Sequence, residues 1–188
     1  MLSDEANPTK FPAPEWEKSK HRSDLPFPRL YQTLFSTQFP DSLAFIGPCR
    51  GFSPVVFSNS DLASQAIAQV WKGTYPLPKA IEMERWCDEN YDRALKQIKT
   101  WRIPLTGADP VEFERWLNKV VGNGVNEALG WGLEGWKFWW RERKLYGLIV
   151  DGVNTPFVYR LFAGREGSRR GFDGAREAIY KVNGRVLR

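Results

Sequence analysis

The pattern G-x-G-x-x-G, which in nucleotide-binding proteins holds a pyrophosphate, occurs once in this chain, from Gly130 to Gly135. It binds phosphate when a strand delivers its first glycine and small residues let backbone amides reach the ligand. Here the preceding VNEALG does not have the pattern of a strand, and Trp131 and Glu134 put bulk and negative charge where phosphate would lie. We therefore expect no phosphate loop here, and the neighbouring GNGVNE, residues 122–127, predicts a helix stop and a turn.

A second candidate is the cluster WKFWWRERK, residues 136–144, which mixes four aromatic with four basic residues. Such a mixture is typical of stacking platforms for single-stranded nucleic acid, which would bind strongly and with a steep salt dependence. The alternative, which we favour, is a helix that directs its aromatic side chains into the core and its basic side chains to water. The aromatic residues are Trp136, Phe138, Trp139 and Trp140.

Metal and nucleophile chemistry have little support. Cys49 and Cys87 lie 38 residues apart without a C-x-x-C motif, and His21 is the sole histidine, so we expect reduced thiols, no metal site and no nucleophilic triad. A carboxylate pair for acid–base catalysis stays open, because no spacing singles one out. The catalytic residues are therefore unknown from the sequence.

The stretch SLAFIGPCRGF, residues 42–52, raises the question of a nucleotide site differently. Leu43–Ile46 predicts a buried strand that ends at Gly47, and α/β proteins hold nucleotides where strands end in this way. The residues that follow Gly47 predict a turn that is neither helix nor strand.

The other elements that the sequence predicts are mostly helices. Ser60 is a good N-cap with Asp61 in the first turn, and Gly73 stands where a helix ends. Asp109 and Pro110 have the same meaning for a later helix. The spacing of apolar residues predicts helices over 29–35, 60–73, 79–99, 110–122 and 173–182, and a strand over 157–162.

Composition sets the class. A chain of 188 residues is long enough for one good core, or for one core and a smaller satellite, and the nine Trp indicate packing by large flat side chains. The formal charge of +5 is a smaller and less concentrated surplus than nucleic-acid binders usually carry. Residues 1–28 combine acids with prolines, so we expect an extended lead-in without a secretion signal. No apolar run is long enough for a membrane helix. A cytoplasmic location is the expectation.

Three parts of the sequence together resemble the C-terminal part of flavin-containing monooxygenases, particularly the fungal branch. The likeness runs from about Arg29 to Arg188. It is carried by LYQTLF with DSLAFIG and SDLASQAIAQVWKGTYPLP, then by GVNEALGWGLEGWKFWW, and finally by VNTPFVYRLF with FDGAREAIYKVNGR.

The resemblance implies an enzyme in which NADPH reduces FAD and the flavin hydroperoxide oxygenates a soft nitrogen or sulfur atom of a small molecule. Such enzymes bind FAD and NADPH on two glycine-rich loops of Rossmann units. In the family both loops lie upstream of the matched region, and this sequence does not contain them. The resemblance therefore implies a truncated or split enzyme that is inactive as an isolated chain.

Carried over by position, SLAFIG resembles the strand whose end passes near the flavin, and SDL resembles a helix start close to the same cofactor. The family's polar residue after that start is Ala63 here, and Pro48 replaces an aspartate found in related flavoproteins. Simple packing of a strand on a helix is the alternative role for all of these residues. The implied cofactor-binding residues are Gly47, Pro48, Cys49, Arg50, Ser60 and Asp61.

The predicted fold is an α/β fragment: the terminal strand and helix of a Rossmann-type FAD domain, followed by a mainly helical, Trp-rich C-terminal region. The predicted divisions are a lead-in at 1–28, the FAD-domain remnant at 29–75 and the helical region at 76–188. A non-catalytic binding module and a subunit of a split flavoenzyme are the alternative functions. Expected partners are a small-molecule substrate if the missing domains are supplied, a complementing polypeptide or further copies of the chain, and neither nucleic acid nor membrane.

Overall fold

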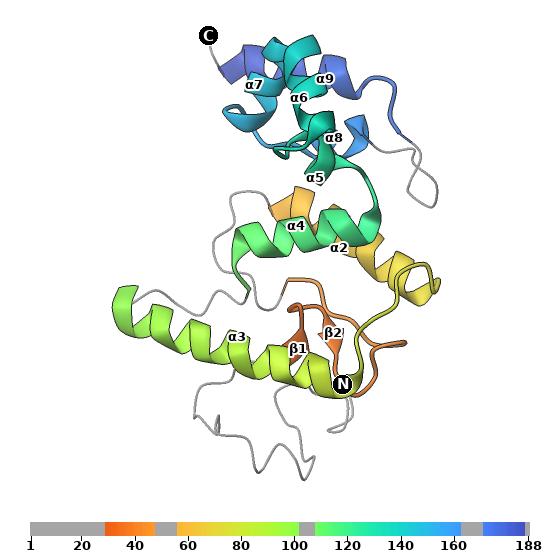
Figure 1. The fold of residues 1–188 in the computed structure, drawn as a ribbon, viewed down its shortest axis with the longest axis vertical. Helices are drawn as coiled ribbons and strands as arrows, with labels where there is room; N and C mark the ends of the chain where they lie inside the picture. Colours follow the sequence, from red (N-terminus) through yellow and green to blue (C-terminus); the bar gives the residue numbers. More distant parts are fainter. Residues whose placement is uncertain (1–28, 48–55, 102–107, 163–170, 187–188) are drawn as a thin grey trace. The chain divides into compact units, whose positions relative to one another are not determined.

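A computed structural model of the chain describes residues 29–47, 56–101, 108–162 and 171–186 (Figure 1). This described part is mostly helical and contains a two-stranded sheet. It divides into two compact units, which are described separately: the first takes in residues of 1–53 and 76–113, and the second residues of 54–75 and 114–188. The predicted divisions at residues 28 and 75 stay predictions, as does the Rossmann origin of the N-terminal part.

The first unit begins with a tight hairpin in place of the short helix predicted over 29–35. Strands β1 (Leu30–Tyr31) and β2 (Phe35–Ser36) pair antiparallel, with Tyr31 opposite Phe35. Gln32 and Thr33 have φ angles of 50° and 55°, the left-handed conformation of the central residues of a type I′ turn. The helix prediction was wrong because two apolar pairs separated by two polar residues satisfy helical spacing and a hairpin equally well.

The buried strand predicted at Leu43–Ile46 is also wrong. Only Ala44 forms a bridge, antiparallel to Phe35, and Ile46 is 45% exposed. The chain reverses just before this segment, where the hydroxyl of Ser36 accepts a hydrogen bond from the amide of Phe39 at 3.1 Å. The segment therefore returns along β2 as a short extended edge.

Helix α3 (Ala80–Trp101) agrees with the predicted helix over 79–99 and packs on β1. Glu82 reaches back to the amide of Lys79 at 3.3 Å, as the third residue of a capping box does. Trp86 meets Tyr31 edge to face, with ring centroids 5.4 Å apart. The buried face of α3 recurs every three or four residues and consists of Met83, Cys87, Asn90, Tyr91 and Ala94.

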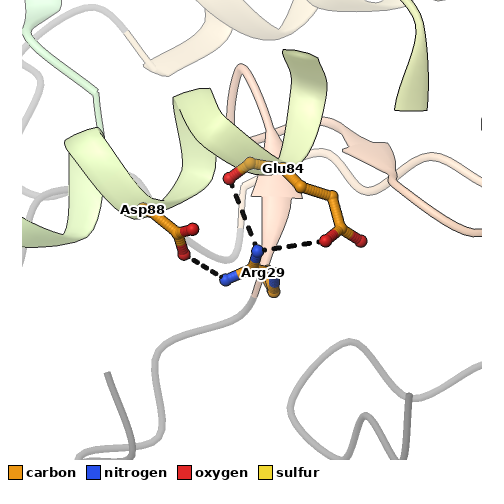
Figure 2. A network of polar contacts seen from close by, with 3 residues as sticks. All are labelled: Arg29, Glu84 and Asp88. Carbon is orange, nitrogen blue, oxygen red and sulfur yellow. Dashed lines mark hydrogen bonds and ion pairs between the residues drawn. The ribbon is translucent and has the colours of Figure 1, made fainter. Parts of the chain in front are cut away.

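Arg29 ties the start of β1 to this helix. Its guanidinium is 8% exposed and donates to Asp88 at 2.5 Å and to Glu84 at 3.3 Å, and Figure 2 shows both carboxylates reaching it from α3. The hydrogen bond with Asp88 and the charges of both acids raise the pKa of Arg29, against the lowering effect of burial, which is the largest single contribution. The ion pair therefore compensates a buried charge.

In the second unit, helix α2 (Val56–Trp71) begins four residues before the predicted N-cap. Ser58 is fully buried on the same face as Leu62 and Ala66, so burial extends the helix upstream of Ser60. The prediction that Ser60 caps the helix with Asp61 in its first turn was therefore wrong. The end was predicted correctly, because Gly73 follows α2 with a φ of 78° and donates to the carbonyl of Val70.

Helix α4 (Pro110–Val121) starts as predicted. The carboxylate of Asp109 accepts hydrogen bonds from the amides of Val111 and Glu112, both at 3.0 Å. The predicted stop is confirmed at Gly122, whose φ is 66°. The turn that follows is held by Asn123, which is buried and donates to Asn118 at 2.7 Å.

The C-terminal helices surround one apolar core. They are α5 (Val125–Ala128), α6 (Leu133–Arg141), α7 (Arg143–Val150), α8 (Pro156–Leu161) and α9 (Ala175–Val186). The core consists of Leu145, Ile149, Val158 and Ile179, with Leu129, Phe138, Leu148, Phe157, Leu161, Phe162 and Tyr180 packed against them.

Helix α8 replaces the strand predicted over 157–162, which was wrong. Alternation of side chains in FVYRLF favoured a strand, but Pro156 provides the first position of a helix. The predicted final helix over 173–182 is confirmed by α9. Its Asn183 is buried and accepts a hydrogen bond from the amide of Val153 at 2.9 Å, so α9 holds the link between α7 and α8.

No helix in the described ranges combines the length and the apolar content needed to cross a membrane.

Substitution Asp88→Asn tests the anchor of Arg29. We expect it to lower the free energy of unfolding by about 1 kcal/mol, because a charge-assisted hydrogen bond to a buried guanidinium is weakened while Glu84 keeps part of the compensation. The matched control is Glu89→Gln, an exposed acid on the same helix, which should change stability little. Equal unfolding midpoints in urea for the two variants would contradict the anchoring role.

Candidate functional site

The residues predicted to lie near a cofactor do not form one described cluster. Gly47 is exposed with a φ of 102°, and a Cβ added there would meet nothing within 4 Å. Residues 48–50 lie outside the described part. Ser60 and Asp61 lie half-buried on α2, where Asp61 accepts a hydrogen bond from Gln65 at 3.0 Å. Gly47 belongs to the first unit and the two α2 residues to the second, so their joint role in cofactor binding stays a prediction.

Two of the three glycines of GWGLEG, Gly130 and Gly135, serve helix packing. Helix α5, and not a strand, precedes Gly130 in the chain, as the sequence indicated. A Cβ on Gly135 would lie 1.8 Å from the carbonyl oxygen of Gly130, and a Cβ on Gly130 would lie 2.6 Å from that of Asn126. Both distances are shorter than side chains tolerate. These two glycines therefore let α5 and the first turn of α6 approach backbone to backbone.

An aromatic pocket opens beside this contact. It has a volume of about 330 Å³ and is enclosed by residues from the α5–α6 link, α6 and α7. The rings of Trp136 and Trp139 meet edge to face with centroids 5.6 Å apart, and Trp131 is 93% exposed. We call this cavity the aromatic pocket; its lining residues are Leu129, Gly130, Trp131, Gly135, Trp136, Trp139 and Tyr146.

The expectation that all four aromatic residues of 136–144 enter the core was therefore wrong. Phe138 does so, with its ring 5.0 Å from that of Phe162, but Trp136 is 56% and Trp140 is 74% exposed. A nine-residue helix turns through more than two turns, so consecutive aromatic residues cannot share one face. Sequence reasoning did not identify Trp131 as a pocket residue. Its position between two glycines, which offer no side chains to pack against it, was a signal that it is exposed.

A cation borders the aromatic pocket. The guanidinium of Arg143 lies 4.5 Å from the centroid of the Trp139 ring, within the range of a cation–π contact. Such a contact holds the indole ring in place. It also puts a positive charge next to one wall of the cavity.

A second, charged pocket of about 360 Å³ lies along another side of α6. Its lining includes two ion pairs, Glu134 with Lys137 at 3.1 Å and Glu142 with Arg176 at 2.6 Å. The hydrogen bond from Arg176 holds the pKa of Glu142 below its ordinary value, and the same bond raises the pKa of Arg176. Arg141 completes the charged lining.

Tyr159 is a buried hydrogen-bond donor with a structural role. Its hydroxyl donates to Glu114 at 2.7 Å, and Asn154 donates to it at 3.4 Å. Burial, helped by the negative charge of Glu114, raises the pKa of Tyr159 above its ordinary range. The phenol is therefore neutral at physiological pH and links α8 to α4.

Two of the described features, the aromatic pocket and the charged pocket, are cavities of a size that suits small-molecule binding. Among the residues with described positions, no group of three His, Cys, Asp or Glu side chains is placed to hold a metal ion. The aromatic pocket offers flat apolar walls and one neighbouring cation, which bind and orient a ligand. The charged pocket offers paired charges that compensate one another.

Comparison with known proteins gives one clear relative. The chain is 36% identical over 179 residues to the Monooxygenase aurF of Gibberella zeae. The aligned region covers 95% of this chain and 33% of that protein. The chain thus spans about a third of the length of this relative. Neither a family model nor a solved structure matches the present chain. The chain is therefore related to a monooxygenase, and membership of the flavin-containing branch stays a prediction.

The packing role of the glycine pattern is tested by Gly135→Ala. We expect it to lower the free energy of unfolding by about 1 to 3 kcal/mol, because the new methyl group clashes with the backbone of Gly130 and forces α5 and α6 apart. Gly132→Ala in the same pattern is the matched control, since its Cβ would meet nothing within 4 Å and its φ is −80°. Similar losses of thermal stability in both variants would contradict a packing role.

A pH effect follows from the pair of Glu142 with Arg176. Because the pKa of Glu142 is lowered in the folded state, its stabilising contribution is complete above the ordinary glutamate pKa, roughly 4.3, and is lost as the pH falls through the lowered value. In Arg176→Gln we expect an NMR titration to show the pKa of Glu142 moving upward. Arg141→Gln removes another cation of the same pocket and should leave the pKa of Glu142 unchanged. An upward shift of that pKa by the same amount in Arg141→Gln would refute the pairing.

Proposed function

We propose that this chain is the C-terminal part of an FAD- and NADPH-dependent monooxygenase that oxygenates a soft nitrogen or sulfur atom of a small molecule. The observation that carries the proposal is the similarity to Monooxygenase aurF, which runs through 95% of this chain and only a third of that relative. A chain of this kind is expected to complete an enzyme whose dinucleotide loops are carried elsewhere.

The structure supports a completing role. Among the described candidates for cofactor contact, Gly47 has surroundings that suit it, because its exposed backbone and open Cβ direction allow close approach by a ligand. Ser60 and Asp61 do not fit the helix start assigned to them, because the amides at the start of α2 lie four residues earlier. FAD and NADPH would thus be held mainly by residues outside this chain.

The second unit supports an alternative, a binding module without catalysis. Its apolar core is built from its own helices, and it carries an aromatic pocket whose walls include exposed tryptophans. Such a module would bind a ligand or a partner and would not need flavin.

Two measurements separate these functions. We expect the purified chain to show no flavin absorbance and no NADPH oxidation, and both to appear when it is co-expressed with a polypeptide, encoded next to it, that carries two glycine-rich loops of the Rossmann kind. A stable complex without flavin, together with adjacent coding sequence that lacks such loops, would favour the binding module. Flavin binding by the chain alone would refute the dependence on a second segment.

A further inference from the structure

We infer that the aromatic pocket is a binding site for a flat aromatic small molecule that carries an acidic group. This inference goes beyond the proposed function and does not depend on it, since it concerns residues of the second unit alone. Three features of the pocket carry it: the shape of its walls, the exposure of its rings and the sign of the charge beside it.

The walls suit a flat ligand. A volume of about 330 Å³ lies at the lower end of the range of small-molecule sites, which corresponds to a ligand of two or three fused rings. Trp131, Trp136 and Trp139 are three of the seven residues that line the pocket. Gly130 and Gly135 line it without side chains, so backbone and flat rings bound the space.

The exposure of the rings means that a ligand would gain free energy by covering them. Trp131 and Trp136 both keep most of their surface in water although they line a cavity. Aromatic rings that stack on or meet a ligand edge to face contribute beyond the apolar area that they bury. Tyr146, a further aromatic residue of the lining, adds apolar area to the same cavity.

The charge beside the pocket favours an acid. The described lining residues include no carboxylate, and Arg143 lies against the ring of Trp139. Two acids of α6 and its end, Glu134 and Glu142, are paired with Lys137 and Arg176 in the charged pocket. Glu127 of α5, whose backbone lies near Gly130 and Gly135, does not line the aromatic pocket. Arg143 therefore favours an anionic over a cationic group on a ligand that contacts Trp139.

The test uses naphthoate, a flat aromatic acid, and naphthylmethylammonium, a cation of similar size, with binding to the intact chain measured by calorimetry. We expect naphthoate to bind and the cation to bind more weakly. Trp136→Ala should weaken naphthoate binding about two- to tenfold, the loss of one aromatic contact. Arg143→Gln should narrow the difference between the acid and the cation.

The matched control is Trp140→Ala, which removes an exposed tryptophan of the same helix that does not line the pocket. Because its ring contacts the pocket indirectly, through Trp139 at 6.2 Å between ring centroids, this variant should weaken naphthoate binding clearly less than Trp136→Ala does. Trp131→Ala provides a second test at a side chain so exposed that folding does not depend on it, and circular dichroism melting checks each variant. No naphthoate binding, equal effects of Trp136→Ala and Trp140→Ala, or equal affinity for acid and cation would overturn the inference. Tighter, salt-dependent binding of a single-stranded oligonucleotide that Trp136→Ala abolishes would overturn it in favour of nucleic acid.

Discussion

The arrangement of the C-terminal helices depends on one close contact, the approach of the α5–α6 link to the first turn of α6 at Gly130 and Gly135. Because no side chain separates the two backbones, the carbonyl oxygen of Gly130 lies directly against Gly135, and this contact fixes the direction in which α6 starts. That direction decides which aromatic residues of α6 face the core. Phe138 packs on Phe162, and Trp136 is left on the wall of an open cavity.

Local chemistry made some elements predictable from sequence and tertiary packing made others unpredictable. Asp109 and Pro110 predict the start of α4, since a carboxylate cap and a first-position proline stabilise a helix start through contacts within its first turn. The start of α2 depends on the burial of Ser58, which no local signal reveals. The helix predicted over 29–35 and the strand predicted over 157–162 were wrong because short apolar patterns satisfy more than one period.

The site was predictable to a similar degree. The prediction that no strand precedes GWGLEG is confirmed, because α5 precedes it, and the absence of phosphate binding there stays a prediction. Sequence reasoning did not find the pocket, since a chain with nine tryptophans suggests that they fill a core. Whether a tryptophan is buried depends on the direction of its helix. Gly135 sets the direction of α6 through a close backbone contact, whereas the G-x-G-x-x-G pattern to which it belongs is usually associated with nucleotide binding.

The ion pairs of Arg29 have a mechanical consequence. Arg29 directly precedes β1, and its guanidinium grips two successive turns of α3 through Glu84 and Asp88 (Figure 2). A pull on the polypeptide before this residue would load the helix first and the two-residue strand second. The two-residue strand would therefore be loaded only after the ion pairs of Arg29 had broken.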